Sequence, residues 1–282
     1  MAKVKDIQWN KIVYGNGVYV AVGSNVLDSN AAYSTDGINW IPVNTTVYSI
    51  ISLCYGNGKF IAWAMGIHEN ASNSDGFLGS SVDGKSWNFT KLGYYIDDIK
   101  SDIIFAENKF VACGKSKVVE YSTNGINWNS VTVVNYSMSY SKIVYGNGIY
   151  ACFELKSTQV RYSMSSTGLT GSWKAGNLKS EHSISYLTDI VFDGEKFVLL
   201  CSDNIYTSTD LKTFTKVVSF DFGRMNALSY KNGLYVAVGM NDSNNNAYLA
   251  YSFDLTNWIS MNPIIDSENI TITDSINTVL LA

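Results

Sequence analysis

The residues of this chain that could carry out acid–base or metal chemistry are few and scattered. The 282 residues include two histidines, His68 and His182, and neither lies at metal-ligand spacing from a second ligand. No serine occupies a Gly-x-Ser-x-Gly turn. Two facing carboxylates would suffice to hydrolyse a glycosidic bond, and the acids available for such a pair include Glu69, Asp97, Asp98, Glu181, Asp189 and Asp221. We therefore predict a chain that is not an enzyme and holds no cofactor, with a glycoside hydrolase or lyase as the alternative.

The four cysteines fall in four separate apolar runs, at Cys54, Cys113, Cys152 and Cys201. Such cysteines usually act as small buried hydrophobic residues. We expect four buried thiols.

The elements that position these residues come from a block of about 44 residues that occurs six times. Each block has a first phrase of the type Tyr-Gly-Asn-Gly and a second phrase that ends in an aromatic residue. The first phrases begin at Tyr14, Tyr55, Phe105, Tyr145, Phe192 and Tyr230, and the second phrases end at Trp40, Trp87, Trp128, Trp173, Phe214 and Trp258. Regular periods of this length are typical of stacked repeat proteins.

Each block predicts four short strands. In the first, Asn16-Gly17 is a hairpin turn, and the expected strands are 12–14, 18–23, 31–34 and 38–43. Four antiparallel strands per repeat predict an all-β, six-bladed β-propeller over residues 1–262. Residues 263–282 form a strand-like tail that is expected to close the ring or to contact a second copy in a homo-oligomer.

The second phrase resembles the Asp-box, Ser-x-Asp-Gly-x-x-Trp, of sialidase-like (bacterial neuraminidase repeat) propellers. Residues 34–40 and 81–87 match it fully, and residues 122–128 carry Asn124 in place of the acid. Two copies keep the acid, Asp210 and Asp254, without the glycine, and the copy expected from Ser163 to Trp173 is interrupted by an insertion.

This resemblance implies structural roles for Asp36, Asp83, Asn124, Asp210 and Asp254, because in that family these turns face away from the active site. The sialidases of the family hold the substrate carboxylate with three arginines. This chain has only Arg161 and Arg224, and lysine cannot replace the guanidinium fork. The resemblance therefore implies a non-catalytic member and not a sialidase.

A binding site is expected at the end of the sheets opposite these turns. In a four-stranded antiparallel blade, the first and third turns share one end, and the longer connections share the other, where function usually gathers. Aromatic residues on those connections offer rigid contact area for sugars. The predicted ligand-binding residues are Tyr48, Tyr94, Tyr95, Tyr136, Tyr140, Tyr186, Phe222, Arg224 and Tyr248.

Two long connections add polar residues to the same predicted surface. His68 and Glu69 are further candidates for ligand contact, and Asp75 and Asp242 are weak candidates for calcium, since neither segment matches a full calcium loop. Simple polar loops are the alternative.

Charge and hydropathy exclude some partners. The net charge is −4, which argues against nucleic acid, and no apolar run is long enough to span a membrane. We read no signal peptide at the N-terminus. The favoured function is recognition of a glycan or cell-surface polymer, as in an adhesin or the receptor-binding protein of a phage tail. The expected location is extracellular, at a cell surface or on a virion, and a structural or protein-docking propeller is a further alternative.

Overall fold

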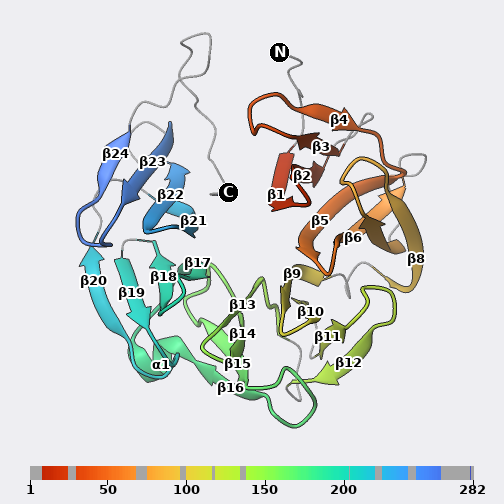
Figure 1. Ribbon diagram of the computed structural model, residues 1–282. Helices are drawn as coiled ribbons and strands as arrows, with labels where there is room; N and C mark the ends of the chain where they lie inside the picture. The colour runs from red at the N-terminus through yellow and green to blue at the C-terminus, as the bar shows by residue number, and fades with distance from the viewer. Residues whose placement is uncertain are drawn as a thin grey trace. The chain divides into compact units, whose positions relative to one another are not determined.

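The computed structural model describes residues 8–24, 30–67, 75–95, 100–115, 118–133, 138–202, 204–219, 224–240, 246–261 and 280. These residues form 24 strands and one short helix (Figure 1). The chain divides into two compact units, unit 1 with residues 1–143 and 168–174, and unit 2 with residues 144–167 and 175–282. The strands expected within residues 270–281 lie outside the described residues, apart from Leu280.

Repeats one and two share one sheet instead of forming two separate ones. Its eight strands are β1 Gln8–Gly15, β2 Val18–Ser24, β3 Ala31–Ser34, β4 Ile41–Val43, β5 Val47–Gly56, β6 Lys59–Ile67, β7 Asp75–Ser81 and β8 Asn88–Tyr95. A single residue pair, Ser24 with Ser49, joins β2 to β5, and the two hydroxyl oxygens lie 2.6 Å apart. The expectation of six independent sheets is therefore corrected at this point.

The other repeats each form a four-stranded antiparallel sheet of the predicted kind. Repeat three has β9 Lys100–Ala106, β10 Lys109–Gly114, β11 Val118–Ser122 and β12 Asn129–Thr132. Repeat four has β13 Lys142–Gly146, β14 Ile149–Phe153, β15 Arg161–Ser165 and β16 Lys174–Asn177. Repeat five has β17 Leu187–Phe192, β18 Phe197–Cys201, β19 Asn204–Ser208 and β20 Thr215–Ser219. Repeat six has β21 Arg224–Lys231, β22 Leu234–Met240, β23 Ala247–Ser252 and β24 Ile259–Met261.

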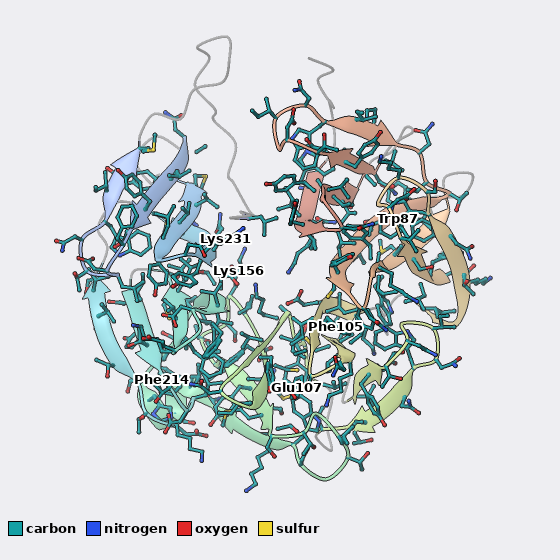
Figure 2. The ribbon with its side chains drawn as sticks, viewed as in Figure 1. Trp87, Phe105, Glu107, Lys156, Phe214 and Lys231 are labelled. Carbon is teal, nitrogen blue, oxygen red and sulfur yellow. The ribbon has the colours of Figure 1, made fainter. Side chains whose placement is uncertain are left out.

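The first glycine of the Tyr-Gly-Asn-Gly phrase is explained by how neighbouring repeats stack. A Cβ on Gly56 would lie 2.1 Å from Cγ of Phe105 (labelled in Figure 2), the aromatic residue that begins the first phrase of the next repeat. A Cβ on Gly15 would meet Tyr55 in the same way, and one on Gly146 would meet Phe192. Only glycine therefore lets the ring of the next repeat lie against the strand end.

The fourth strand of the first repeat starts later than expected, at Ile41 instead of Ile38. The Asp36 carboxylate accepts the backbone N–H groups of Ile38 and Asn39 at 2.9 and 2.7 Å. Those two N–H groups are therefore committed to the turn and cannot enter the ladder.

Two local features of the fourth repeat differ from expectation. Tyr150 pairs with Ser165, as Tyr19 pairs with Ser34 in the first repeat, so the second phrase of repeat four begins at Ser165 and not at Ser163. A helix that was not expected, α1 Leu178–His182, follows β16. The Asn177 side chain caps its N-terminus by accepting from the N–H groups of Lys179 and Ser180.

Among the described residues, no helix is long and apolar enough to cross a membrane.

The core is apolar with a few buried charges. All four cysteine thiols are buried, as expected, and burial, with the charge of nearby Asp102, raises the pKa of Cys54 to about 12. In unit 1 the Lys100 Nζ lies 3.2 Å from the Glu120 Oε1, with both side chains almost fully enclosed. Trp63 is fully buried and meets Trp128 edge-on, with ring centroids 4.4 Å apart.

Candidate functional site

The turns that resemble the Asp-box are closed hydrogen-bonded units. In repeat five, Asp210 Oδ1 accepts the N–H groups of Lys212 and Thr213 at 2.8 and 2.9 Å, while Ser208 Oγ accepts that of Leu211 at 2.7 Å. These bonds hold the pKa of Asp210 down at about 2. Equivalent backbone bonds reach Asp36, Asp83, Asn124 and Asp254. In each turn the Oδ1 atom is occupied by the turn itself.

The first phrases and the Asp-boxes lie at the same end of the sheets, as predicted. In unit 1, Asn16 Nδ2 donates to the carbonyl of Val82, in the Asp-box of the next repeat, at 3.0 Å. In unit 2, Asn147 Nδ2 donates at 3.0 Å to the carbonyl of Thr209, again in the Asp-box of the next repeat. We call this the Asp-box end, and the opposite end, with the other connections, the loop end.

The structure corrects two of the residues predicted to contact a ligand at the loop end. Tyr140 is fully enclosed and Tyr248 is 3% exposed. Tyr140 is held in place by a backbone bond from its N–H to the carbonyl of Gly114, and Tyr248 packs in the core of repeats five and six. Both rings are packing residues, since a ring with no accessible face cannot stack on a ligand.

The other predicted residues divide into three groups. Tyr186 is 47% exposed, Tyr48 is half-buried and Arg224 is exposed. Tyr94 and Tyr95 belong to β8, and nothing further is described of their side chains. The remaining predictions lie outside the described residues, at Tyr136, Phe222, His68, Glu69 and Asp242.

Tyr186 is the most informative of these residues because its backbone is strained. Its φ is 53°, which is uncommon for a bulky residue. Two backbone bonds hold it there: its N–H donates to the carbonyl of Ser157 at 2.9 Å, and its carbonyl accepts from Ser202 at 3.2 Å. These bonds fix the backbone that carries the half-exposed ring. Strain of this kind gathers at functional sites.

Lys156, labelled in Figure 2, lies on the loop between β14 and β15, and the carbonyl of Ser157 on this loop accepts the N–H of Tyr186. Lys156 is exposed and also has a positive φ, 56°. Its N–H donates to the carbonyl of Leu187 at 2.7 Å, directly beside the bond between Tyr186 and Ser157. Two adjacent backbone bonds thus hold the main chains of two exposed residues, Lys156 and Tyr186, close together. Sequence reasoning missed Lys156, since a lysine in a polar loop carries no distinguishing signal.

Arg224 begins β21, a strand that lies beside β17. The contact between the two strands is fixed by Asp189, whose Oδ2 accepts the N–H of Leu228 at 2.9 Å. Because β17 and β21 both start at the loop end, Arg224 and Tyr186 lie on the same side of unit 2. The loop end of this unit therefore carries Lys156, Tyr186 and Arg224.

The carboxylates described near this surface hold the fold together. Asp189 is buried, and its Oδ1 also accepts the N–H of Ile190 at 2.8 Å. Glu181 accepts the Tyr162 hydroxyl at 2.7 Å and the N–H of Asn177 at 2.9 Å, and the hydroxyl bond contributes most to lowering its pKa. His182, beside it, packs on Phe214 (the latter labelled in Figure 2), with ring centroids 4.7 Å apart.

The acids offer no metal-binding group within the described part of the chain. No cluster of three histidine, cysteine, aspartate or glutamate side chains that could hold a metal occurs among those residues. Asp75, a weak calcium candidate, instead forms an ion pair with Lys91 Nζ at 2.6 Å.

Comparison with known folds finds similar solved structures. YCF48 bound to D1 peptide aligns with a TM-score of 0.64 at 16% identity, over 93% of this chain and 83% of that chain. A Trypanosoma rangeli sialidase in complex with sialic acid aligns with a TM-score of 0.54 at 14% identity, over 89% of this chain and 55% of that chain. The Neurospora crassa Pan2 WD40 domain gives a TM-score of 0.54 at 8% identity, over 81% of this chain and 71% of that chain.

No family model and no curated protein matches the sequence. At these identities the structural likeness shows the fold alone. Together with the four-stranded antiparallel sheets, it establishes the architecture: the chain has an all-β, propeller-like fold.

Proposed function

We propose that this chain is a non-enzymatic binding module, a six-bladed propeller that recognises a glycan or cell-surface polymer through its loop end. Strands β1–β4 and β5–β8 count as two blades in this proposal, because one residue pair joins them. The observation that carries the binding proposal is the strained, half-exposed Tyr186, whose backbone is bonded next to that of the exposed Lys156.

The chemistry of this surface favours a ligand that combines rings with negative charge. An exposed tyrosine ring offers a flat face on which a sugar ring can stack. Lys156 and Arg224 supply cations that attract carboxylate or sulfate groups, and arginine can bind a carboxylate through two parallel hydrogen bonds. Both cations are exposed in a chain whose net charge is −4. An acidic glycan meets these requirements.

Two described acids support the non-enzymatic part of the proposal. Asp189 and Glu181, two of the carboxylates considered for glycoside hydrolysis, are engaged in the backbone and hydroxyl bonds described above. A glycan-binding role also fits an extracellular, cell-surface or virion location, as in an adhesin or a phage tail protein. The bound peptide of the YCF48 structure favours a second candidate, docking of a protein segment on the same scaffold.

The test is a glycan-array screen of the purified chain, followed by titration of the best acidic glycan and its neutral counterpart. We expect Tyr186→Ala and Lys156→Ala each to weaken binding about tenfold, since each removes a contact worth roughly 1.4 kcal/mol. Binding should also weaken as salt rises, because the cations are exposed.

The matched control is Tyr14→Ala. Tyr14 is 46% exposed, almost the same as Tyr186, but lies at the Asp-box end. Its loss should leave glycan binding unchanged. If the Tyr14 variant loses binding and the Tyr186 variant keeps it, the choice of surface is wrong. A screen in which no glycan binds, together with capture of a peptide ligand, would favour the docking alternative.

A further inference from the structure

A pocket of about 340 Å³ opens at the Asp-box end of the second repeat, within unit 1. Its lining includes Lys59 at the start of β6, Ser80 on β7, and Val82 and Ser86 of the Asp-box turn. The pocket is also lined by Ser81, Trp87 (labelled in Figure 2) and Asn88. The volume lies at the small end of the range for ligand pockets.

The register of the sheets shows which side chain each repeat has at the position of Ser80; repeats four and five have Met164 and Thr207 there. Ser80 pairs with Ile61 of the neighbouring strand, one residue before the serine that begins the Asp-box. Three other repeats have tyrosine at this position. Their pairs are Tyr33 with Val20, Tyr121 with Val111 and Tyr251 with Val236. The second repeat has a small hydroxyl side chain where those repeats have a phenol ring.

The chain itself shows how this position accommodates a ring. In unit 1, Lys85 Nζ lies 5.0 Å from the ring centroid of Tyr33, a favourable cation–π arrangement. In unit 2, Tyr251 meets Phe253 edge-on at 6.0 Å between centroids. Phe253 and Val82 occupy the same place in the Asp-box, directly after its serine. Val82 is 65% exposed. Its apolar surface in repeat two is therefore available to a ring, as that of Phe253 is to Tyr251 in repeat six.

The polar groups of the pocket suit the other parts of a tyrosine side chain. Lys59 Nζ donates to the Asn124 carbonyl at 3.2 Å and can offer its remaining N–H groups and its charge to a ring. The exposed Ser86 hydroxyl and Asn88 amide are hydrogen-bonding groups that could meet a phenol hydroxyl. Lys59 could thus contact a bound ring as Lys85 contacts Tyr33, and Val82 could do so as Phe253 contacts Tyr251.

We propose that this pocket binds a tyrosine side chain presented by a partner protein, which fills the place that Tyr33, Tyr121 and Tyr251 fill in their own repeats. The site is separate from the loop end and does not depend on glycan recognition. It would give the module a protein-docking point at its Asp-box end.

The experiment titrates N-acetyl-tyrosinamide into the full chain and follows the backbone amide resonances of Ser80, Val82 and Asn88 by NMR. Wild type should bind in the millimolar range, as expected for a small ligand of this size. Ser80→Tyr restores the ring of the other repeats, and we expect it to weaken binding at least tenfold and to raise the thermal midpoint. Ser80→Ala keeps the pocket open and should bind like wild type.

Two controls separate filling of the pocket from other effects. Thr90→Tyr adds a ring at an exposed position of β8 and should leave binding unchanged. N-acetyl-leucinamide and methyl glucopyranoside should not shift the three amides. The proposal is overturned if Ser80→Tyr binds the ligand as well as wild type, or if it fails to fold while Ser80→Ala folds. It is also overturned if the sugar shifts these amides at lower concentration than the tyrosine compound. Glycan binding at Tyr186 should be the same in all these variants.

Discussion

Replacing Asp210 by asparagine tests the structural role of the Asp-box turns. Asn124, which occupies the same position in the third repeat, accepts the N–H groups of Ile126 and Asn127, both at 2.9 Å. An amide oxygen can therefore make the two backbone bonds of this turn. Asp210→Asn should keep those bonds and remove only the charge.

The magnitude follows from the lowered pKa of Asp210. Backbone bonds from Thr213 and Lys212 lower it from 3.8 to about 2. Such a shift would correspond to roughly 2.5 kcal/mol of stability if it acted in full. Solvent screens a partly exposed carboxylate, so we expect Asp210→Asn to lose about 1 kcal/mol of unfolding free energy at pH 7.

The control is the pH dependence of the difference in unfolding free energy between wild type and Asp210→Asn. A carboxylate with a lowered folded-state pKa stabilises the protein above its unfolded pKa of 3.8, and the stabilisation disappears as the pH falls through about 2. Urea unfolding of wild type and Asp210→Asn should therefore differ at pH 7 and converge near pH 2. A difference that stays constant across this range would refute the reasoning, because it would show that the lost stability does not come from the carboxylate charge.

Two further substitutions test the packing. Gly56→Ala would place a methyl group 2.1 Å from the Phe105 ring. We expect chemical denaturation to show a loss of about 2 kcal/mol in unfolding free energy, and a smaller loss in a Phe105→Ala background. Equal losses in both backgrounds would contradict the stacking of Phe105 on Gly56. Glu120→Gln removes the negative partner of the enclosed Lys100 ammonium, and we expect the unfolding free energy to fall by about 3 kcal/mol. A fall of less than about 1 kcal/mol would mean that the ion pair is solvated.

Much of the fold could be predicted because the repeat links local turns to a periodic pattern. Asn16-Gly17 specifies its hairpin through positive φ angles, which the structure shows at 49° and 78°. The joining of repeats one and two was not predictable, since it depends on where Ser24 and Ser49 meet in space. Helix α1 was missed because it is a single turn in the connection between repeats four and five, although the cap formed by Asn177 is a recognisable signal.

The candidate site was only partly predictable for a similar reason. Tyr140 and Tyr186 both lie on connections at the loop end, yet one is enclosed and the other is half exposed. The residue type and its place in the repeat do not determine which way a ring turns. The exposure of each ring depends on tertiary contacts, such as the backbone bonds that join Tyr186 to Ser157 and Ser202. The pocket beside Ser80 became visible only when the strand register aligned it with Tyr33.

The most direct measurement compares the affinities of Tyr186→Ala and Tyr14→Ala for one acidic glycan taken from the array. The exposed fractions of Tyr186 and Tyr14 are nearly equal, at 47% and 46%. Both variants therefore lose about the same exposed aromatic surface. If recognition takes place at the loop end, the first variant binds about tenfold more weakly than the second. Equal affinities, or a larger loss in the Tyr14 variant, would contradict the assignment.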